Sequence, residues 1–328
     1  MTQQRKRIFL LGATGTIGRA AVQALLDRGH AVVCFLREGS RRSPAEARRL
    51  LPGAELRFGE VTDPQSLEED GFCGERFDAL VSCMTSRSGA PKDAWAIDYA
   101  AHVNALAAAK AAGVSQMVLL SAICVQKPRL EFQKAKLAFE QELIDSGLTY
   151  SIVRPTAFFK SLSGQIERIK EGKPYLLVGN GRVTACKPIS DGDLAAYLAD
   201  CLEDESLQNQ ILPIGGPGPA VTPKEQAEKL FALLGLEPRY KRVPVTLFWL
   251  IIGALSLAGR VSSKAAEKAE FARIGRYYAT ESMLVWNEEA GHYDVEATPS
   301  TGSETLFGFY EKLVRGEVKL DRGDHAVF

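Results

Sequence analysis

The chain has 328 residues, of which 46% are hydrophobic and 24% charged, a composition typical of a globular protein. Its 40 basic and 40 acidic residues cancel, so it has neither the basic excess of a nucleic-acid-binding protein nor that of a polybasic membrane anchor, and we expect no nucleic-acid partner. The length allows one large domain, or a large domain with a smaller one attached.

The N-terminal half alternates short apolar strands with helical segments. This alternation predicts an α/β fold, a doubly wound parallel-sheet Rossmann fold with strand order 3-2-1-4-5-6, over residues 1–155. Strands are predicted at 7–11, 31–36, 55–58, 77–82, 116–120 and 149–153, and helices at 17–28, 44–50, 92–112 and 132–146.

A glycine-rich turn follows the first predicted strand. The run GATGTIG, residues 12–18, places Gly12, Gly15 and Gly18 between a strand and a helix. In dinucleotide-binding folds the first glycine permits a tight turn, the second lets the backbone approach the pyrophosphate, and the third lets the helix pack against the strand. Unpaired N–H groups at the start of the helix then bind the phosphates. We therefore predict a dinucleotide site; the alternative is a glycine-rich turn without a ligand.

The end of the second strand indicates which dinucleotide binds. NAD sites usually place an acidic residue there, but this chain has Arg37, with Arg41 and Arg42 close behind. Guanidinium groups bind a 2′-phosphate through paired charged hydrogen bonds, which favours NADPH, whereas Glu38 is the one nearby acid and argues for NAD. Asp63, after the third strand, is a reasonable contact for the adenine amino group, or equally a helix cap.

The alternation of strands and helices breaks after Pro155. We predict that residues 156–328 form a smaller, mostly helical substrate-binding region that packs on the first domain, with some strands returning to its sheet. The expected elements are a helix over 160–173, a hairpin over 174–190 that turns at 179–181, a helix from Ser190 or Asp191, a strand near 209–215, and a helix capped by Thr222.

The longest uncharged run is Val243–Gly259, VPVTLFWLIIGALSLAG. Its length is at the lower edge of what spans a bilayer. We expect a buried helix, with an interfacial helix and a true membrane span as the alternatives.

Cysteines and histidines show no metal-site pattern. None of the six cysteines forms a CxxC pair, and the four histidines are scattered. Several cysteines lie in apolar runs, so we expect buried thiols in a reducing compartment, and no metal.

Several runs within residues 7–200 resemble the short-chain dehydrogenase/reductase superfamily, in its atypical branch related to isoflavone reductases and NmrA-like proteins. These runs are GATGTIG, VLLSAI, KAKLAFEQELIDSGLTYSIVRPTAFF and KPISDGDLA. Further runs resemble the divinyl chlorophyllide a 8-vinyl-reductases, NADPH-dependent oxidoreductases of (bacterio)chlorophyll biosynthesis. They are DALVSCMTSRSGAPKDAWAIDYAAHVNALAAAKAAGV, LLSAICVQKP, RPTAFFKSLSGQ, ARIGRYYATESMLV and GDHAVF.

The resemblance implies an enzyme that uses NADPH to reduce the 8-vinyl group of divinyl chlorophyllide a, or of its protochlorophyllide relative, to ethyl. It implies Lys136 and Ser121 as catalytic residues. The cofactor contacts that it implies are Gly12, Thr14, Gly15, Thr16, Ile17, Gly18, Arg37, Arg41, Asp63, Ser82, Cys83, Lys136, Pro155 and Phe158.

The chain departs from the superfamily at one position. Members carry a YxxxK helix whose tyrosine is the acid and whose lysine holds the nicotinamide ribose, but here Phe132 stands four residues before Lys136. Phenylalanine donates no proton, so carbonyl reduction is disfavoured. A vinyl group conjugated with a tetrapyrrole can accept hydride at its outer carbon, because the macrocycle delocalises the charge. On this hypothesis the enzyme's main task is alignment of the reacting atoms.

A flat macrocycle requires a broad apolar slot with polar ends. We expect Phe132, Phe158 and Phe159 to line it and Lys160, Lys187 and Arg182 to be candidates for the substrate's propionate.

Two other functions stay open: an NmrA-like NADP(H) sensor or assembly factor without catalysis, and a reductase of another conjugated substrate. The first strand begins at about Arg7, so we expect no targeting segment. The expected location is the cytoplasm of a phototrophic bacterium, peripheral at the photosynthetic membrane if 243–259 is interfacial.

Overall fold

The first strand, β1 (Arg7–Leu11), lies inside a seven-stranded sheet of order β3-β2-β1-β4-β5-β6-β8. The structure is a computed structural model that describes residues 5–39 and 43–319. The pairings from β3 through β6 are all parallel. This confirms the doubly wound sheet and its order 3-2-1-4-5-6, to which β8 adds a strand beside β6. Because the order reverses at β1, the loops after β1 and β4 are neighbours at the carboxyl edge, where such folds bind ligands.

The described residues group into two compact units. The first takes the described residues up to Ser86, together with Lys92–Pro155 and Asp191–Leu212, and the second takes Arg87–Pro91, Thr156–Ser190 and the described residues from Pro213 on. The sheet belongs to the first unit up to the end of β6, with β8 at the boundary.

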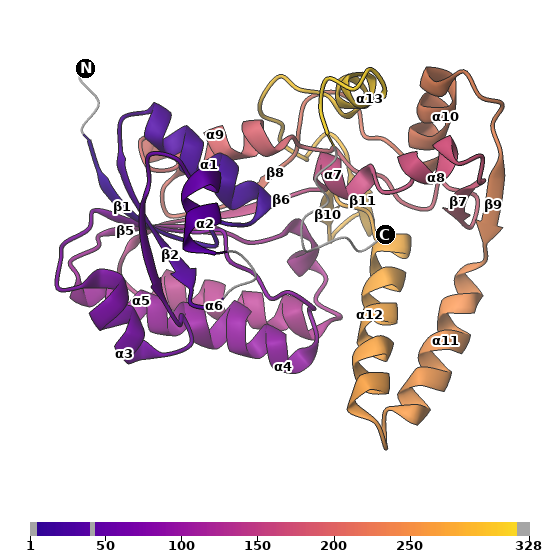
Figure 1. Cartoon of the computed structure of the whole chain (residues 1–328). Coiled ribbons are helices and arrows are strands. Elements are labelled where there is room, and N and C mark those ends of the chain that lie inside the picture. Colours follow the sequence, from indigo (N-terminus) through magenta and orange to yellow (C-terminus); the bar gives the residue numbers. More distant parts are fainter. Residues whose placement is uncertain (1–4, 40–42, 320–328) are drawn as a thin grey trace. The chain divides into compact units, whose positions relative to one another are not determined.

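Helices cover both faces of the sheet in the first unit, with α1 and α9 on one face and α5 and α6 on the other (Figure 1). The core is rich in aromatic rings: Phe9 stacks on Phe72 at a centroid distance of 4.1 Å and meets Phe77 edge-on at 5.4 Å. The strands are β1, β2 (Ala31–Arg37), β3 (Glu55–Gly59), β4 (Ala79–Ser82), β5 (Gln116–Leu120), β6 (Thr149–Pro155) and β8 (Gln210–Ile214). The helices are α1 (Thr16–Asp27), α2 (Pro44–Leu50), α3 (Pro64–Ser66), η1 (Leu67–Phe72), α4 (Pro91–Ala94), η2 (Trp95–Ala101), α5 (His102–Ala111), η3 (Ile123–Gln126), α6 (Glu131–Asp145), α9 (Asp191–Asp200) and η4 (Glu205–Leu207).

The second unit has its own core, centred on the fully buried Tyr310. Thr222 caps α10 through a capping box with Glu225, as predicted. The unit contains α7 (Phe159–Leu162), α8 (Ile166–Lys170), β7 (Tyr175–Val178), α10 (Pro223–Leu234), β9 (Tyr240–Val243), α11 (Val245–Ala258), α12 (Ser263–Thr280), β10 (Val285–Asn287), β11 (His292–Asp294) and α13 (Leu306–Val314).

Three local predictions are wrong. The expected helix over 160–173 is divided into the short helices α7 and α8. The expected hairpin over 174–190 does not form, because β7 pairs in parallel with β9, more than sixty residues later, instead of folding back after the turn. Cys73 is exposed, whereas Cys34, Cys124, Cys186 and Cys201 are buried as expected.

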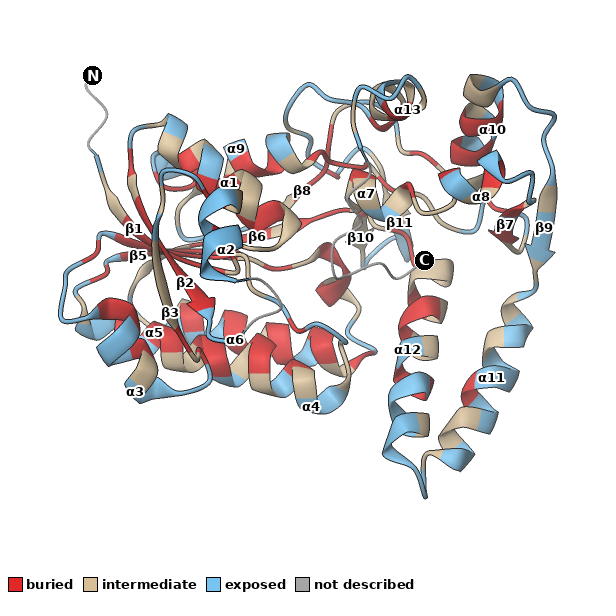
Figure 2. Ribbon diagram, viewed as in Figure 1, coloured by how far each residue is buried: buried red, intermediate tan, exposed pale blue. Residues whose placement is uncertain are grey.

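The uncharged segment Val243–Gly259 contains α11, and the expectation of a buried helix is wrong there too. Ile252 is the one buried residue of α11, and most of the others are exposed (Figure 2). No helix among the described residues is long and apolar enough to cross a membrane, so the spanning alternative is also wrong.

Candidate functional site

The glycine loop is packed against the chain that follows β4. Gly12 has φ +78°, a left-handed conformation that favours glycine, and a Cβ there would lie 2.5 Å from the carbonyl carbon of Cys83. A Cβ on Gly18 would lie 2.1 Å from the carbonyl oxygen of Gly12. The turn and the close helix–strand approach predicted for these two glycines are therefore present.

The first turn of α1 fits a phosphate group. Its N-cap is Gly15, which has no side chain to accept from the first N–H groups, and the turn contains no acidic residue. The helix dipole therefore acts on a bound anion without competition from a side chain.

The residues predicted to select NADPH or NAD lie at the end of β2 and after β3. Arg37, the last residue of β2, has a half-exposed side chain whose Nε lies 3.9 Å from Glu60 Oε2, a loose contact that leaves the guanidinium accessible. Asp63 caps α3, because its Oδ1 accepts the N–H of Gln65 at 3.0 Å, as the capping alternative predicts. Arg41 and Arg42 lie outside the described residues.

Lys136 is a buried, paired lysine. It lies on α6 with only 10% of its side chain exposed, and its Nζ is 2.9 Å from Oδ1 of Asp98 in η2. The alternative of a solvated surface lysine is therefore wrong. One of the three ammonium N–H groups points to Asp98, which leaves two that could donate to ribose hydroxyls.

Asp98 is an ionised carboxylate inside the protein. Its Oδ1 also accepts the hydroxyl of Thr85 at 3.0 Å and the N–H of Ser86 at 3.1 Å. Burial by itself would raise the pKa of Asp98, but the charge of Lys136 and the hydrogen bonds from Ser86 and Lys136 outweigh it, so that pKa lies below its ordinary value. Its Oδ2 is buried and has no hydrogen-bond partner among the described residues, so it is one further acceptor beside Lys136.

His102 continues this buried network from the start of α5. Its Nδ1 lies 2.8 Å from the carbonyl oxygen of Ile97, which can only accept, so Nδ1 carries the hydrogen. Nε2 then accepts the hydroxyl of Ser82 at 2.8 Å. Burial, together with the positive charge of Lys136, lowers the pKa of His102 to about 4, so the ring is neutral and binds the end of β4.

A second buried carboxylate holds Ser121. Glu140 lies four residues after Lys136 on α6 and is 2% exposed. It forms an ion pair with Arg154 of β6 and accepts the hydroxyl of Ser121, which follows β5. Because the only hydroxyl hydrogen of Ser121 is donated to Glu140, the oxygen offers a bound ligand an acceptor rather than a donor.

Phe132 occupies the position of the absent tyrosine. It lies four residues before Lys136 on α6 and is 8% exposed. The stripe of α6 that carries Phe132, Lys136 and Glu140 therefore contains no hydroxyl acid. The nearby hydroxyls of Ser82, Thr85 and Ser121 already donate to His102, Asp98 and Glu140.

The predicted substrate residues lie in the second unit, apart from Phe132. Phe158 is half-buried and forms a bridge with Ile189. Phe159 is 2% exposed and packs in the core of that unit with its ring 5.5 Å from that of Phe309, which does not favour a role in the slot. The ammonium of Lys187 donates to the carbonyl oxygen of Thr298 at 2.9 Å. Pro155, predicted as a cofactor contact, ends β6.

The sequence reasoning missed Asp98, His102, Glu140 and Arg154. A pattern in the sequence could have found the first two: Asp98 and His102 lie four residues apart in an otherwise apolar helical segment, which indicates a buried polar pair. Glu140 likewise follows Lys136 at helical spacing, on the buried side of α6.

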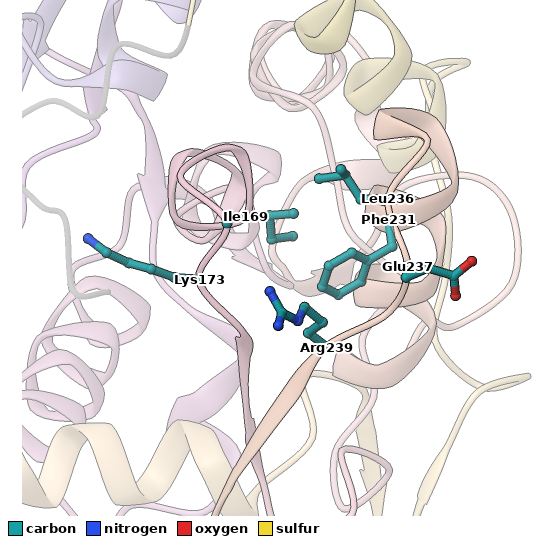
Figure 3. Close-up of a pocket in the computed structure, with 7 residues that line it drawn as sticks. Ile169, Lys173, Phe231, Leu236, Glu237 and Arg239 are labelled. Atoms are coloured by element: carbon teal, nitrogen blue, oxygen red, sulfur yellow. The ribbon is translucent and has the colours of Figure 1, made fainter.

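The second unit also has a shallow cavity of about 250 Å³ next to α8 and α10. Its apolar lining includes Ile169 and Phe231, whereas Lys173 extends away from it (Figure 3). This volume is below that of most small-molecule sites, and none of the predicted site residues lines it. The cavity is therefore a poor candidate for a tetrapyrrole site.

Comparison with known proteins is consistent with a dinucleotide-binding reductase. The profile of the NAD(P)H-binding family matches residues 12–205. The chain is 49% identical to the chloroplastic divinyl chlorophyllide a 8-vinyl-reductase of Arabidopsis thaliana, over 94% of this chain and 76% of that protein. It is 49% identical to the enzyme of the same name from Oryza sativa subsp. indica, over 98% of this chain and 82% of that protein.

Solved structures support the fold. An NADPH-dependent quinone oxidoreductase of Escherichia coli superposes with a TM-score of 0.65 at 20% identity, covering 94% of this chain and 99% of that chain. At this identity the likeness is evidence for the Rossmann fold alone.

Proposed function

The chain belongs to the NAD(P)H-binding family and, within it, to the divinyl chlorophyllide a 8-vinyl-reductases, and from this premise we propose that it reduces the 8-vinyl group of divinyl chlorophyllide a, or of its protochlorophyllide relative, to ethyl. What carries the proposal is the extent of the similarity, which continues through both units instead of ending with the dinucleotide-binding fold that many reductases share.

Bound NADPH would supply the hydride. The first turn of α1 binds the pyrophosphate, because its N–H groups have no side-chain acceptor. Arg37 binds the 2′-phosphate from the end of β2. Lys136 holds the nicotinamide ribose through the two N–H groups that it does not share with Asp98. Further proposed contacts are Thr14 in the loop after β1, Thr16 and Ile17 at the start of α1, and Ser82 and Cys83 at and after the end of β4.

The side chains around Lys136 suit a substrate that needs no acid at an oxygen atom. When hydride reaches the outer vinyl carbon, the negative charge is delocalised into the macrocycle, and the inner carbon then takes a proton from water or another modest donor. Phe132 has no proton to donate, and Ser121 donates its hydroxyl hydrogen to Glu140. The protein therefore contributes mainly alignment of the reacting atoms, and a carbonyl substrate would lack the donor that its oxyanion requires.

The test is anaerobic turnover with NADPH and each of the two divinyl substrates, followed by absorbance and by mass of the 8-ethyl product. We expect product from at least one substrate, with a gain of two hydrogen atoms. Binding of NADPH without turnover of either pigment would contradict the proposal and favour a non-catalytic sensor or assembly factor.

The cofactor assignment has its own control. Arg37→Ala should raise KM for NADPH about tenfold or more while leaving KM for NADH nearly unchanged, because one charged contact with the 2′-phosphate contributes roughly 1.5–3 kcal/mol. An equal effect on both cofactors would indicate that Arg37 acts on folding and not on recognition.

We also infer that the protein lies in the cytoplasm and contacts the photosynthetic membrane peripherally through residues 243–259. The exposed apolar surface of α11 supports this inference.

A further inference from the structure

The α11–α12 hairpin presents large apolar side chains to solvent. The exposed fractions of Leu250, Leu257 and Val261 are 72%, 65% and 91%. Trp249 and Phe271, at 61% and 51%, add to this surface. Figure 2 shows α11 mostly exposed and α12 exposed mainly in its first half, near the tip of the hairpin. An apolar surface of this extent marks an interaction site.

The exposed residues of α11 form one continuous stripe. Leu247, Leu250, Ile251, Ala254 and Leu257 are all exposed, and each lies three or four residues from another member of the set, which places them on one side of the helix. Val261, in the turn after α11, continues this apolar surface. Between Val243 and Gly259 the chain has no charged residue. The stripe is therefore apolar from the start of α11 to the tip of the hairpin.

Polar contacts hold α12 against the other side of α11. Arg276 lies over the ring of Trp249 at 3.9 Å, and Arg273 donates to Ser256 at 2.7 Å. Arg273 also pairs with Glu270 of its own helix at 2.9 Å. These contacts fix the two helices as a pair and leave the stripe facing outward.

Basic residues lie at both ends of the stripe. Residues 239–268 contain six basic side chains and one acidic side chain, Glu267, although the whole chain has 40 of each. The six are Arg239, Lys241 and Arg242 before α11, and Arg260, Lys264 and Lys268 after it. The local excess is thus five positive charges, in the sequence on either side of the apolar segment.

We propose that the α11–α12 hairpin binds a bilayer surface that contains anionic lipids, with the stripe in the headgroup and acyl boundary and the flanking basic side chains on lipid phosphates. At 1.5 Å per residue, the 14 residues of α11 extend about 21 Å, too short for a hydrocarbon core of about 30 Å. The helix therefore lies along the surface. A second copy of the chain fits less well, because it would bring the same positive excess to the contact.

This inference deepens the proposed membrane contact but does not depend on the proposed reaction. Its test is flotation of the full chain with vesicles of neutral phosphatidylcholine and with vesicles that contain about 30% phosphatidylglycerol. We expect at least tenfold more protein on the anionic vesicles, and a large loss of that binding in high salt, because the flanking cations are attracted to the lipid phosphates and salt screens that attraction. Equal binding to both vesicles would overturn the proposal.

Paired variants separate the stripe from a general effect of charge. Leu250→Asp/Leu257→Asp should abolish flotation, whereas Val183→Asp, at a position 47% exposed in the same unit, should leave it unchanged. Arg260→Glu/Lys264→Glu should reduce binding to anionic vesicles only. If the Leu250→Asp/Leu257→Asp variant floats like the unaltered chain, the lipid assignment is wrong. It is also wrong if sedimentation shows that the unaltered chain is a dimer and this variant is a monomer. Turnover measured without vesicles should be the same for all these variants, so a failed reaction and a failed membrane contact give different results.

Discussion

The ammonium nitrogen of Lys136 lies 2.9 Å from the carboxylate of Asp98, a side chain with no solvent exposure. This contact gives the lysine two roles that must be separated. It presents donors toward the proposed ribose site, and it is also the counter-charge of a carboxylate that cannot reach water. A substitution of Lys136 alone therefore changes folding and cofactor use together.

Lys136→Met should lower the free energy of unfolding by roughly 3–5 kcal/mol, because it leaves the Asp98 carboxylate buried without its partner. It should also weaken the use of NADPH strongly. Urea unfolding and the dependence of turnover on NADPH concentration measure the two effects.

Lys136→Met/Asp98→Asn is the control for this prediction. The double variant removes both charges, so most of the lost stability should return, while NADPH use stays impaired. If NADPH use returned together with stability, Lys136 would have a structural role only.

Gly12→Ala should disturb the cofactor loop more than Gly29→Ala does. Both glycines have positive φ, +78° and +81°, so each alanine has a strain of about 1 kcal/mol. A Cβ at Gly12 also meets the Cys83 backbone at 2.5 Å, whereas one at Gly29 meets nothing within 4 Å. We expect Gly12→Ala to raise the Kd for NADPH about tenfold or more and Gly29→Ala to leave it unchanged, as measured by cofactor fluorescence. Equal affinities in the two variants would contradict the proposed position of the pyrophosphate.

Acid should destabilise the protein through His102. Its pKa is about 4 in the folded protein, below the ordinary 6.5, so the unfolded chain binds the extra proton between these values and stability falls as the pH drops from 6.5 to 4. The full loss is on the order of 3 kcal/mol. The free energy of unfolding, measured by urea at several pH values, should fall less steeply in His102→Gln.

His292→Gln provides the comparison for this experiment, because His292 is an exposed histidine in the second unit. It should keep the slope of the unaltered protein. If His102→Gln kept that slope as well, other groups would cause the acid sensitivity.

Phe132→Tyr should leave vinyl reduction largely intact, with kcat/KM within about threefold of the original, because the reaction makes no use of an acid at this position. Thermal unfolding must be measured alongside, since the added hydroxyl enters a buried position. Loss of turnover in a folded Phe132→Tyr protein would show that the fit of the substrate against the side chain at position 132 matters more than we propose. Phe132→Leu would then test the effect of side-chain shape without adding a hydroxyl.

The sequence predicted the parts of the protein that depend on local pattern. The six strands of the dinucleotide fold, their order, the glycine turn and the Thr222 cap follow from periodicity and turn chemistry within short windows of sequence. The same is true of Phe132, whose departure from the expected tyrosine is visible in the sequence alone. The family resemblance rests on such short runs as well.

Only the tertiary structure decided which side chains meet and which faces are covered. Asp98 of η2 pairs with Lys136 of α6. Glu140 of α6 contacts Ser121, which follows β5, and Arg154 of β6. The turn after β7 has the composition of a hairpin, but β7 pairs with the distant β9. Residues 243–259 have the composition of a core helix, but too little of the second unit packs around α11 to bury it. Each of these outcomes depends on contacts between residues far apart in the chain. A local sequence pattern does not specify which distant segment packs against it.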